Sequence, residues 1–148
     1  MKKILILILF LCNSCGYQPI YLGQNTDNFL YNEITLTGNN QINKKIISSL
    51  NFKKDDSDRA FDEIIINSNK TITETSKDSK GQISSYKTSI KTELTIKNEG
   101  KIIKNKIFKN DFSYSNKSNK YELAEYKNQV ENNLIKSQIE EIFLFLNL

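Results

Sequence analysis

ISSYKTSIKTELTIK, residues 83–97, is the stretch that decides the fold of this 148-residue chain. Its even positions from Tyr86 to Ile96 hold tyrosine, isoleucine, leucine and threonine, while lysine, serine, glutamate and threonine fill the odd positions from Lys87 to Lys97. Successive side chains of a strand point to opposite faces of a sheet. The alternation therefore predicts a strand with one buried face and one face in water.

A second strand follows directly. The residues NEG, at 98–100, predict a short hairpin turn into KIIKNKIFKNDFSYS, residues 101–115. In this segment two isoleucines share one parity and three aromatic residues share the other: Ile103 and Ile107 against Phe108, Phe112 and Tyr114. Such a slip predicts a β-bulge or a bend near Ile107 and Phe108.

Two further strands precede the central one. Residues 61–76 contain isoleucines of one parity, and residues 29–37, FLYNEITLT, are rich in β-forming residues with an apolar parity of their own. The residues that carry these patterns are Ile64, Ile66 and Ile72 in the first segment and Leu30, Ile34 and Leu36 in the second. Between the two segments, FKKDDSDRA, residues 52–60, predicts a charged loop.

Helical periodicity appears in two places. In residues 40–52 the apolar positions are Ile42, Ile46, Ile47 and Leu50, with lysines and serines on the other face. A longer helix of about 28 residues, roughly 40 Å, is expected to start after Ser118 or Asn119 and to run to the chain end, with Glu122 in its first turn. Its last residues, IFLFLNL, are apolar nearly all round, which suits either a core position or a surface for a partner.

The predicted order is β-α-β-β-β-α. An apolar sheet face and apolar helix stripes must cover each other, so the expected fold is α+β. It is a two-layer sandwich in which two helices pack on one face of a four-stranded, mostly antiparallel sheet. We expect residues 29–148 to form this single domain.

The composition offers little for catalysis. The chain has no histidine, which removes the commonest general base and metal ligand. Adjacent carboxylates such as Asp55 and Asp56 lie in polar segments and are interpreted as solvated charges. No phosphate-binding glycine motif is present. We therefore expect no enzyme, no cofactor and no metal site.

The charge balance argues against nucleic acid as a partner. Without Lys2 and Lys3, 19 basic residues face 17 acidic ones, so the net charge falls from +4 to +2. This is close to neutral for a domain of this size.

The N-terminal residues indicate export. Lys2 and Lys3 precede an apolar run, Ile4 to Leu11, that is followed by small polar residues, as in a signal peptide. The run is too short to span a bilayer, which takes about 20 residues. A plain secretory signal and a C-x-x-C redox or zinc motif formed by Cys12 and Cys15 are alternative interpretations.

The stretch LCNSCG resembles the lipobox of bacterial lipoproteins, with Ser14 before and Gly16 after Cys15. Cys12 stands where that pattern usually has leucine. The resemblance implies that residues 1–14 are a lipoprotein signal peptide, that Cys15 carries the lipid, and that residues 15–28 are the anchor and tether. Gly16, in place of an aspartate, implies sorting to the outer membrane.

The opening CGYQPIY, the segment ITLTGNNQINKKIISSLNF and the closing YELAEYKNQVENNL together resemble the lipopolysaccharide-assembly lipoprotein, or LptE, family in its alphaproteobacterial form. The resemblance implies a lipid-anchored protein on the periplasmic side of the outer membrane. Such a protein plugs and helps to assemble a β-barrel (LptD-like) translocon that inserts lipopolysaccharide, and it can bind lipopolysaccharide itself. Another small lipoprotein module, such as a pilotin or a lipid-transport auxiliary, and a periplasmic hydrolase are the competing hypotheses.

Lysines on the wet face of the sheet are the candidate contacts for lipopolysaccharide phosphates, because lysines two apart on a strand project the same way. The alternative is a solvated face that keeps the sheet soluble, and Glu93 within the row favours that alternative. The candidates are Lys87, Lys91, Lys97, Lys104 and Lys106, with Lys109 also on the second strand.

Overall fold

The computed structural model describes residues 29–57 and 61–148. The segments expected to be the signal peptide and the tether, with Cys12 and Cys15, lie outside the described residues. The elements are β1 (Leu30–Gly38), α2 (Asn40–Leu50), β2 (Lys53–Lys54), β3 (Phe61–Lys77), β4 (Ile83–Asn98), β5 (Lys101–Ser115) and α3 (Lys120–Leu146).

The fold is α+β, as expected, but its sheet has five strands in the order β2-β1-β3-β4-β5. The prediction of four strands was wrong because β2 lies inside the segment expected to be a loop. With two residues, β2 is too short to show a periodicity. It is recognisable only through its parallel pairing with the start of β1, Leu30 opposite Lys53.

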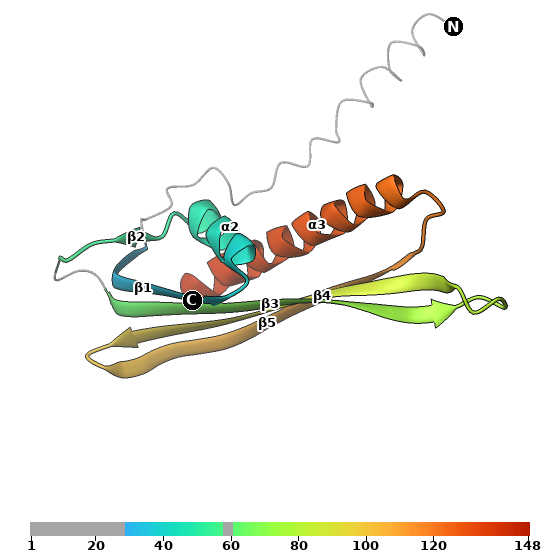
Figure 1. Cartoon of the computed structure of the whole chain (residues 1–148). Coiled ribbons are helices and arrows are strands. Elements are labelled where there is room, and N and C mark those ends of the chain that lie inside the picture. Colours follow the sequence, from blue (N-terminus) through green and yellow to red (C-terminus); the bar gives the residue numbers. More distant parts are fainter. Residues whose placement is uncertain (1–28, 58–60) are drawn as a thin grey trace, which may run out of the picture.

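The strand directions combine two arrangements. β3, β4 and β5 form a long antiparallel meander. β1 runs parallel to β3, from Tyr31 opposite Phe61 to Gly38 opposite Ser68. Two parallel strands need a crossover connection, and α2 lies within it. β1 ends at Gly38, so β3 extends past it together with β4 and β5 (Figure 1).

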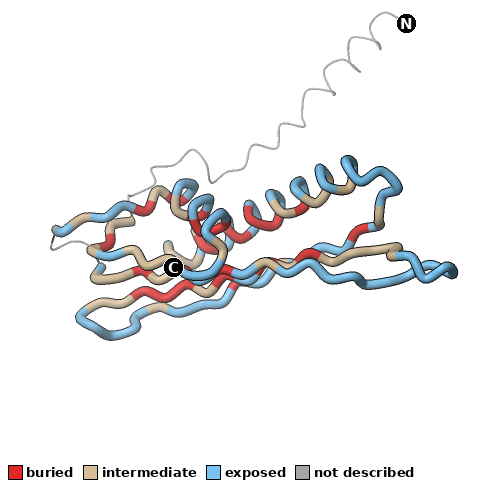
Figure 2. Tube along the Cα trace, viewed as in Figure 1, coloured by how far each residue is buried: buried red, intermediate tan, exposed pale blue. Residues whose placement is uncertain are grey.

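Both helices lie on the same side of the sheet (Figure 1). Buried residues concentrate between the helices and the sheet, while the far end of the β3–β4 hairpin is largely exposed (Figure 2). The core combines side chains from both layers: Tyr31, Ile42, Ile46, Ile64, Ile66, Ile90, Leu94, Ile96, Phe108, Val130, Ile135 and Ile142. Burying such side chains contributes roughly 1.5–3 kcal/mol each.

The alternation that predicted β4 is confirmed. Thr88, Ile90, Thr92, Leu94 and Ile96 are buried on the side that faces the helices. Lys91 on the opposite side is exposed. The pleat of one strand thus separates the core of the protein from its open surface.

The predicted bulge exists, but its position was wrong. Pairing between β4 and β5 shifts between Ile96 and Lys97, which face Lys104 and Ile102, so Ile103 is the extra residue. The strand then keeps one register through Ile107 and Phe108 as far as Ser115. Ile107 stays half exposed on the outer face, and the shift at Ile103 brings Phe108 into the core.

Local signals set the helix starts. Asn39 caps α2, its side-chain oxygen accepting hydrogen bonds from the backbone N–H groups of Gln41 and Ile42 at 3.1 Å. Of the two candidate caps for α3, Asn119 is the one used, and Glu122 lies in the first turn as expected. Gly38, just before the first cap, has a φ of +79°, and a Cβ there would collide with the carbonyl oxygen of Ser68.

The apolar end of α3 is largely packed, as a core position requires. Ile142 is fully buried, and the ring of Phe145 meets that of Phe108 edge to face with centroids 5.8 Å apart. Leu144 remains 46% exposed. Among the described residues, no helix is both long enough and apolar enough to cross a membrane.

Candidate functional surface

The outer face of the sheet, turned away from the helices, is polar. Odd-numbered residues of β3 and β4 supply it, and cross-strand pairs place amides, hydroxyls and lysines side by side. Asn69 lies opposite Lys91 and Thr73 opposite Lys87. A shallow hollow of about 380 Å³ is lined by Asn69, Thr71, Thr73, Lys87, Ser89, Lys91 and Lys109.

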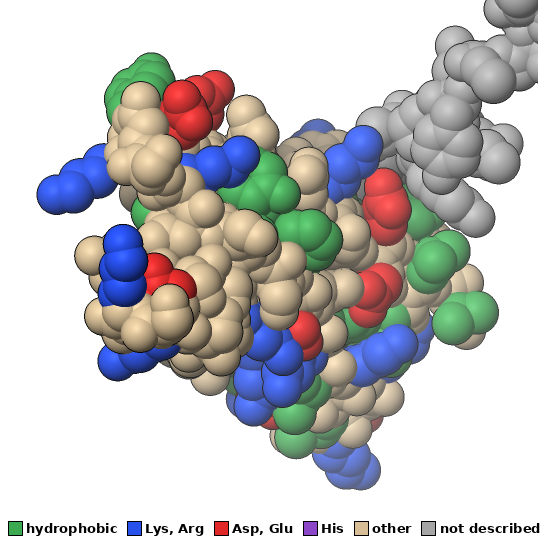
Figure 3. Space-filling model, turned by 90° about the vertical axis from the view of Figure 1, so that its right-hand side faces the viewer, with side chains coloured by type: hydrophobic (Ala, Val, Ile, Leu, Met, Phe, Trp, Pro, Cys, Tyr) green, Lys and Arg blue, Asp and Glu red, His purple; other side chains and the backbone are tan. Residues whose placement is uncertain are grey.

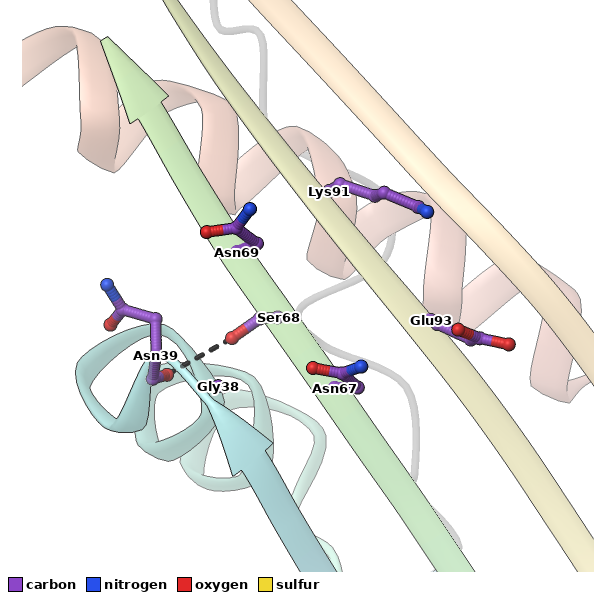
Figure 4. A pocket seen from close by; sticks show the side chains of 7 residues that line it. All are labelled: Gly38, Asn39, Asn67, Ser68, Asn69, Lys91 and Glu93. Carbon is purple, nitrogen blue, oxygen red and sulfur yellow. Dashed lines mark hydrogen bonds between the residues drawn. The ribbon is translucent and has the colours of Figure 1, made fainter.

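A second hollow adjoins the first and shares Asn69 and Lys91 with it. Its other lining residues are Gly38, Asn39, Asn67, Ser68 and Glu93. The Ser68 hydroxyl is not available there, because it lies 2.6 Å from its acceptor Asn43 Oδ1 and 3.1 Å from the carbonyl oxygen of Asn39 (Figure 4). The two hollows together form a continuous polar surface over β3 and β4.

Two of the candidate lysines are engaged in ion pairs. Lys87 Nζ lies 2.9 Å from Asp111 Oδ2, and Lys97 Nζ lies 2.8 Å from Glu63 Oε2. Hydrogen bonding by Lys87 lowers the pKa of the Asp111 carboxyl. The hydrogen bond from Lys97, supported by one from Thr35 at 2.8 Å, lowers the pKa of Glu63. The positive charge of Lys97 is therefore largely balanced by the carboxylate of Glu63.

Lys91 and Lys109 differ from these lysines. They face each other across β4 and β5, and neither is in a salt bridge within the described ranges 29–57 and 61–148. Two adjacent ammonium groups surrounded by amides and hydroxyls suit an anionic, hydroxyl-rich ligand. Sequence reasoning noted Lys109 but not the amides Asn67 and Asn69, whose parity would have placed them on this face.

Lys104 and Lys106 were expected on the outer face, and that placement was wrong. They pair with Ile96 and Leu94, so they lie on the side of the helices. Lys104 Nζ donates to the carbonyl oxygens of Phe145 and Leu146 at 3.4 and 3.3 Å. Lys106 Nζ lies over the Phe108 and Phe145 rings, 5.1 and 5.3 Å from their centroids.

The bulge at Ile103 explains the change of face. Without the extra residue, Lys104 and Lys106 would continue the outward parity that starts at Ile102 opposite Lys97. The inserted residue moves both lysines to the helix side. There Lys104 complements the partial negative charge at the C-terminal end of α3.

The end view of the molecule shows how its charges are distributed. Lysines lie among acidic and neutral polar side chains on this side and do not form one continuous basic surface (Figure 3). The part of the chain that the structure describes holds no group of three or more aspartate, glutamate, histidine or cysteine residues placed to bind a metal ion.

Comparison with known proteins shows that this chain resembles several solved structures in its fold. No protein-family model matches the chain, and no curated protein matches it either. Solved structures do match. Rare lipoprotein B from Shewanella oneidensis superposes with a TM-score of 0.56 at 12% identity, covering 78% of this chain and 94% of that one.

Two further structures have the same arrangement. A putative lipoprotein from Caulobacter crescentus has a TM-score of 0.52 at 8% identity, covering 76% of this chain and 86% of the other. A minor lipoprotein from Acinetobacter baumannii has a TM-score of 0.51 at 11% identity, with 76% and 87% covered. The chain thus shares its fold with solved bacterial lipoproteins.

Proposed function

We propose that this chain is an outer-membrane lipoprotein, anchored by a lipid on Cys15, which binds and plugs or assembles a β-barrel translocon for lipopolysaccharide. Its role is not enzymatic. The observation that carries the proposal is the coincidence of two independent features. The sequence LCNSCG resembles a lipobox, and the domain behind it shares its fold with proteins described as bacterial lipoproteins.

The outer sheet face supports a contact with lipopolysaccharide. Lys91 and Lys109 are the lysines of this face without a carboxylate partner among the described residues, and Lys87 lies in the same hollow. Their ammonium groups would meet phosphates as point charges, while neighbouring threonine and asparagine side chains would meet sugar hydroxyls. Lys104 and Lys106 leave the proposed set because they contact the end of α3.

Copurification tests the partner. The full-length tagged chain is recovered from detergent-solubilised outer membranes, with Cys15→Ala as the matched unanchored control. We expect a β-barrel of the lipopolysaccharide-export system to copurify with the unmodified chain. Recovery of inner-membrane transporters alone would contradict the proposal. Recovery of a secretion pore would favour a pilotin, and a lipid transporter would favour an auxiliary of that system.

Mass spectrometry of the mature N-terminus tests the anchor separately. The expected product begins at Cys15 and carries a diacylglyceryl group on its sulfur. A chain cleaved elsewhere, or one without lipid, would contradict lipid anchoring and leave a plain secretory signal.

Lipopolysaccharide binding tests the outer face. The double variant Lys91→Glu, Lys109→Glu is expected to weaken binding of lipopolysaccharide, because it reverses two adjacent charges. Lys120→Glu, at the exposed start of α3, changes one charge elsewhere and serves as the control. Equal binding by all three proteins would remove the outer face from the proposal.

A further inference from the structure

β5 is the terminal strand of the sheet, and among the described residues no strand pairs with its other edge. It is 15 residues long. Along such an edge, every second residue directs its backbone N–H and C=O groups away from the sheet, which makes the edge a template for another strand. An edge of this length is usually covered or protected.

Exposed apolar side chains gather on this strand. Ile102, Ile103, Ile107 and Phe112 are 63%, 46%, 50% and 48% exposed. Ile107 lies on the outer face and Phe112 on the helix side, because the register places them opposite Glu93 and Thr88. Apolar surface is therefore available on both sides of the free edge.

A groove runs beside the edge on the helix side. It has a volume of about 260 Å³ and lies between Phe112 of β5 and Tyr126, Val130 and Leu134 of α3, with Gln129 and Asn133 among its polar lining. A strand added to β5 would direct every second side chain toward α3, and those side chains would enter this groove.

The charge of the edge selects the occupant. β5 carries Lys101, Lys104, Lys106 and Lys109, and none of them is in an ion pair within the described part of the chain. Lys104 and Lys106 contact the end of α3, so Lys109 is the lysine that a strand beside β5 would meet on the outer face. The acid of this strand, Asp111, is already held by Lys87 at 2.9 Å. Basic edges repel basic strands and favour acidic ones.

We propose that the free edge of β5 and the groove between β5 and α3 bind an extended segment of another protein as a sixth strand. The segment is apolar at alternate positions, which enter the groove, and acidic at the positions between, which lie beside Lys109. Backbone hydrogen bonds supply affinity, and the alternate side chains supply selectivity. The inference is independent of the lipid anchor.

The binding experiment uses the full-length chain in detergent and a fluorescein-labelled eight-residue peptide that alternates isoleucine and glutamate. Anisotropy should show saturable binding, and an isoleucine–lysine peptide should bind more weakly. Two further peptides carry N-methyl groups on residues of one parity or the other. N-methylation of the residues whose N–H groups face β5 should abolish binding, because it removes the hydrogen-bond donors. Unchanged binding of both methylated peptides would overturn the proposal.

A matched pair of variants locates the site. Phe112→Glu places a carboxylate at the groove and should weaken binding of the acidic peptide about tenfold or more. Ile72→Glu is the control, because Ile72 is 43% exposed but lies on β3. Circular dichroism confirms that both variants fold. Equal effects of the two variants, or a larger effect of Ile72→Glu, would overturn the proposal.

Hydrogen exchange on the unmodified chain locates the binding site without relying on variants that could misfold. The peptide should protect amides within residues 101–115, and protection confined to segments other than β5 and the groove-lining part of α3 would contradict strand addition at β5. Sedimentation of the chain without peptide tests the remaining alternative, in which a second copy of this chain covers the edge. A dimer whose β5 amides are already protected would mean that a second copy, and not an acidic partner strand, covers the edge.

Discussion

The two faces of β4 differ in almost every property, although they alternate along one strand. Leu94 is fully buried against the helices, while Lys91, three residues away, is exposed on the open face. Apolar and hydroxyl side chains line the first face; lysines, serine and glutamate line most of the second. The helix layer covers one face and leaves the other to solvent (Figure 1).

The difference separates fold stability from the proposed ligand binding within one element. Substitutions on the helix side remove packing or leave buried polar groups without partners. Substitutions on the outer side remove surface ion pairs, which contribute little to folding, and the proposed ligand contacts. Four measurements test this division.

The largest effect is expected for Leu94→Ala. Its side chain is 0% exposed in the centre of the core, so truncation loses apolar burial and leaves a cavity. The free energy of unfolding should fall by about 2–5 kcal/mol, measured by urea denaturation. A loss below about 1 kcal/mol would mean that the helices do not pack on this face as described.

Gln138→Ala should cost about 1–3 kcal/mol. The Gln138 side chain is buried, accepts from Thr92 Oγ1 at 2.6 Å and donates to the carbonyl oxygen of Ile90 at 2.8 Å. Truncation leaves the buried Thr92 hydroxyl without this acceptor and the Ile90 carbonyl without this donor. The double variant Thr92→Val, Gln138→Leu removes donor and acceptor together and should recover much of the loss, which a double-mutant cycle in urea measures.

Glu63→Gln should cost less than about 1 kcal/mol at pH 7, since its ion pair with Lys97 is partly exposed. Lys97 lowers the pKa of Glu63 in the folded state, so the ion pair stabilises the fold above the unfolded pKa of about 4.3. That stabilisation disappears as the pH falls through the lower folded pKa. The unfolding free energies of the two proteins should therefore converge in acid, and a constant difference would contradict this linkage.

Lys91→Ala should change the free energy of unfolding by no more than about 0.5 kcal/mol. The side chain is exposed and outside any ion pair within residues 29–57 and 61–148. Its thermal unfolding should match that of the unmodified chain. A shift comparable to that of Leu94→Ala would contradict the division between the two faces.

The sequence by itself determined the class of the fold and much of its core. Period-two alternation located β4, and period-3.6 stripes located α2 and α3, because local geometry fixes which side chains share a face. Ser118 or Asn119, with Glu122 in the first turn, marked the start of α3 for the same local reason, and the structure uses Asn119. The candidate anchor, Cys15, rests on sequence alone and lies outside the described residues.

Only the tertiary structure decided the remaining features. The two-residue β2 exists through its pairing with β1, which no local pattern encodes. The parity slip in β5 was visible, but the inserted residue is Ile103 because the register must bring Phe108 and Tyr114 under α3. That choice moves Lys104 and Lys106 from the outer face to the end of α3 and leaves Ile107 on the outer face. Register is a long-range property, set by which side chains the helix layer can bury.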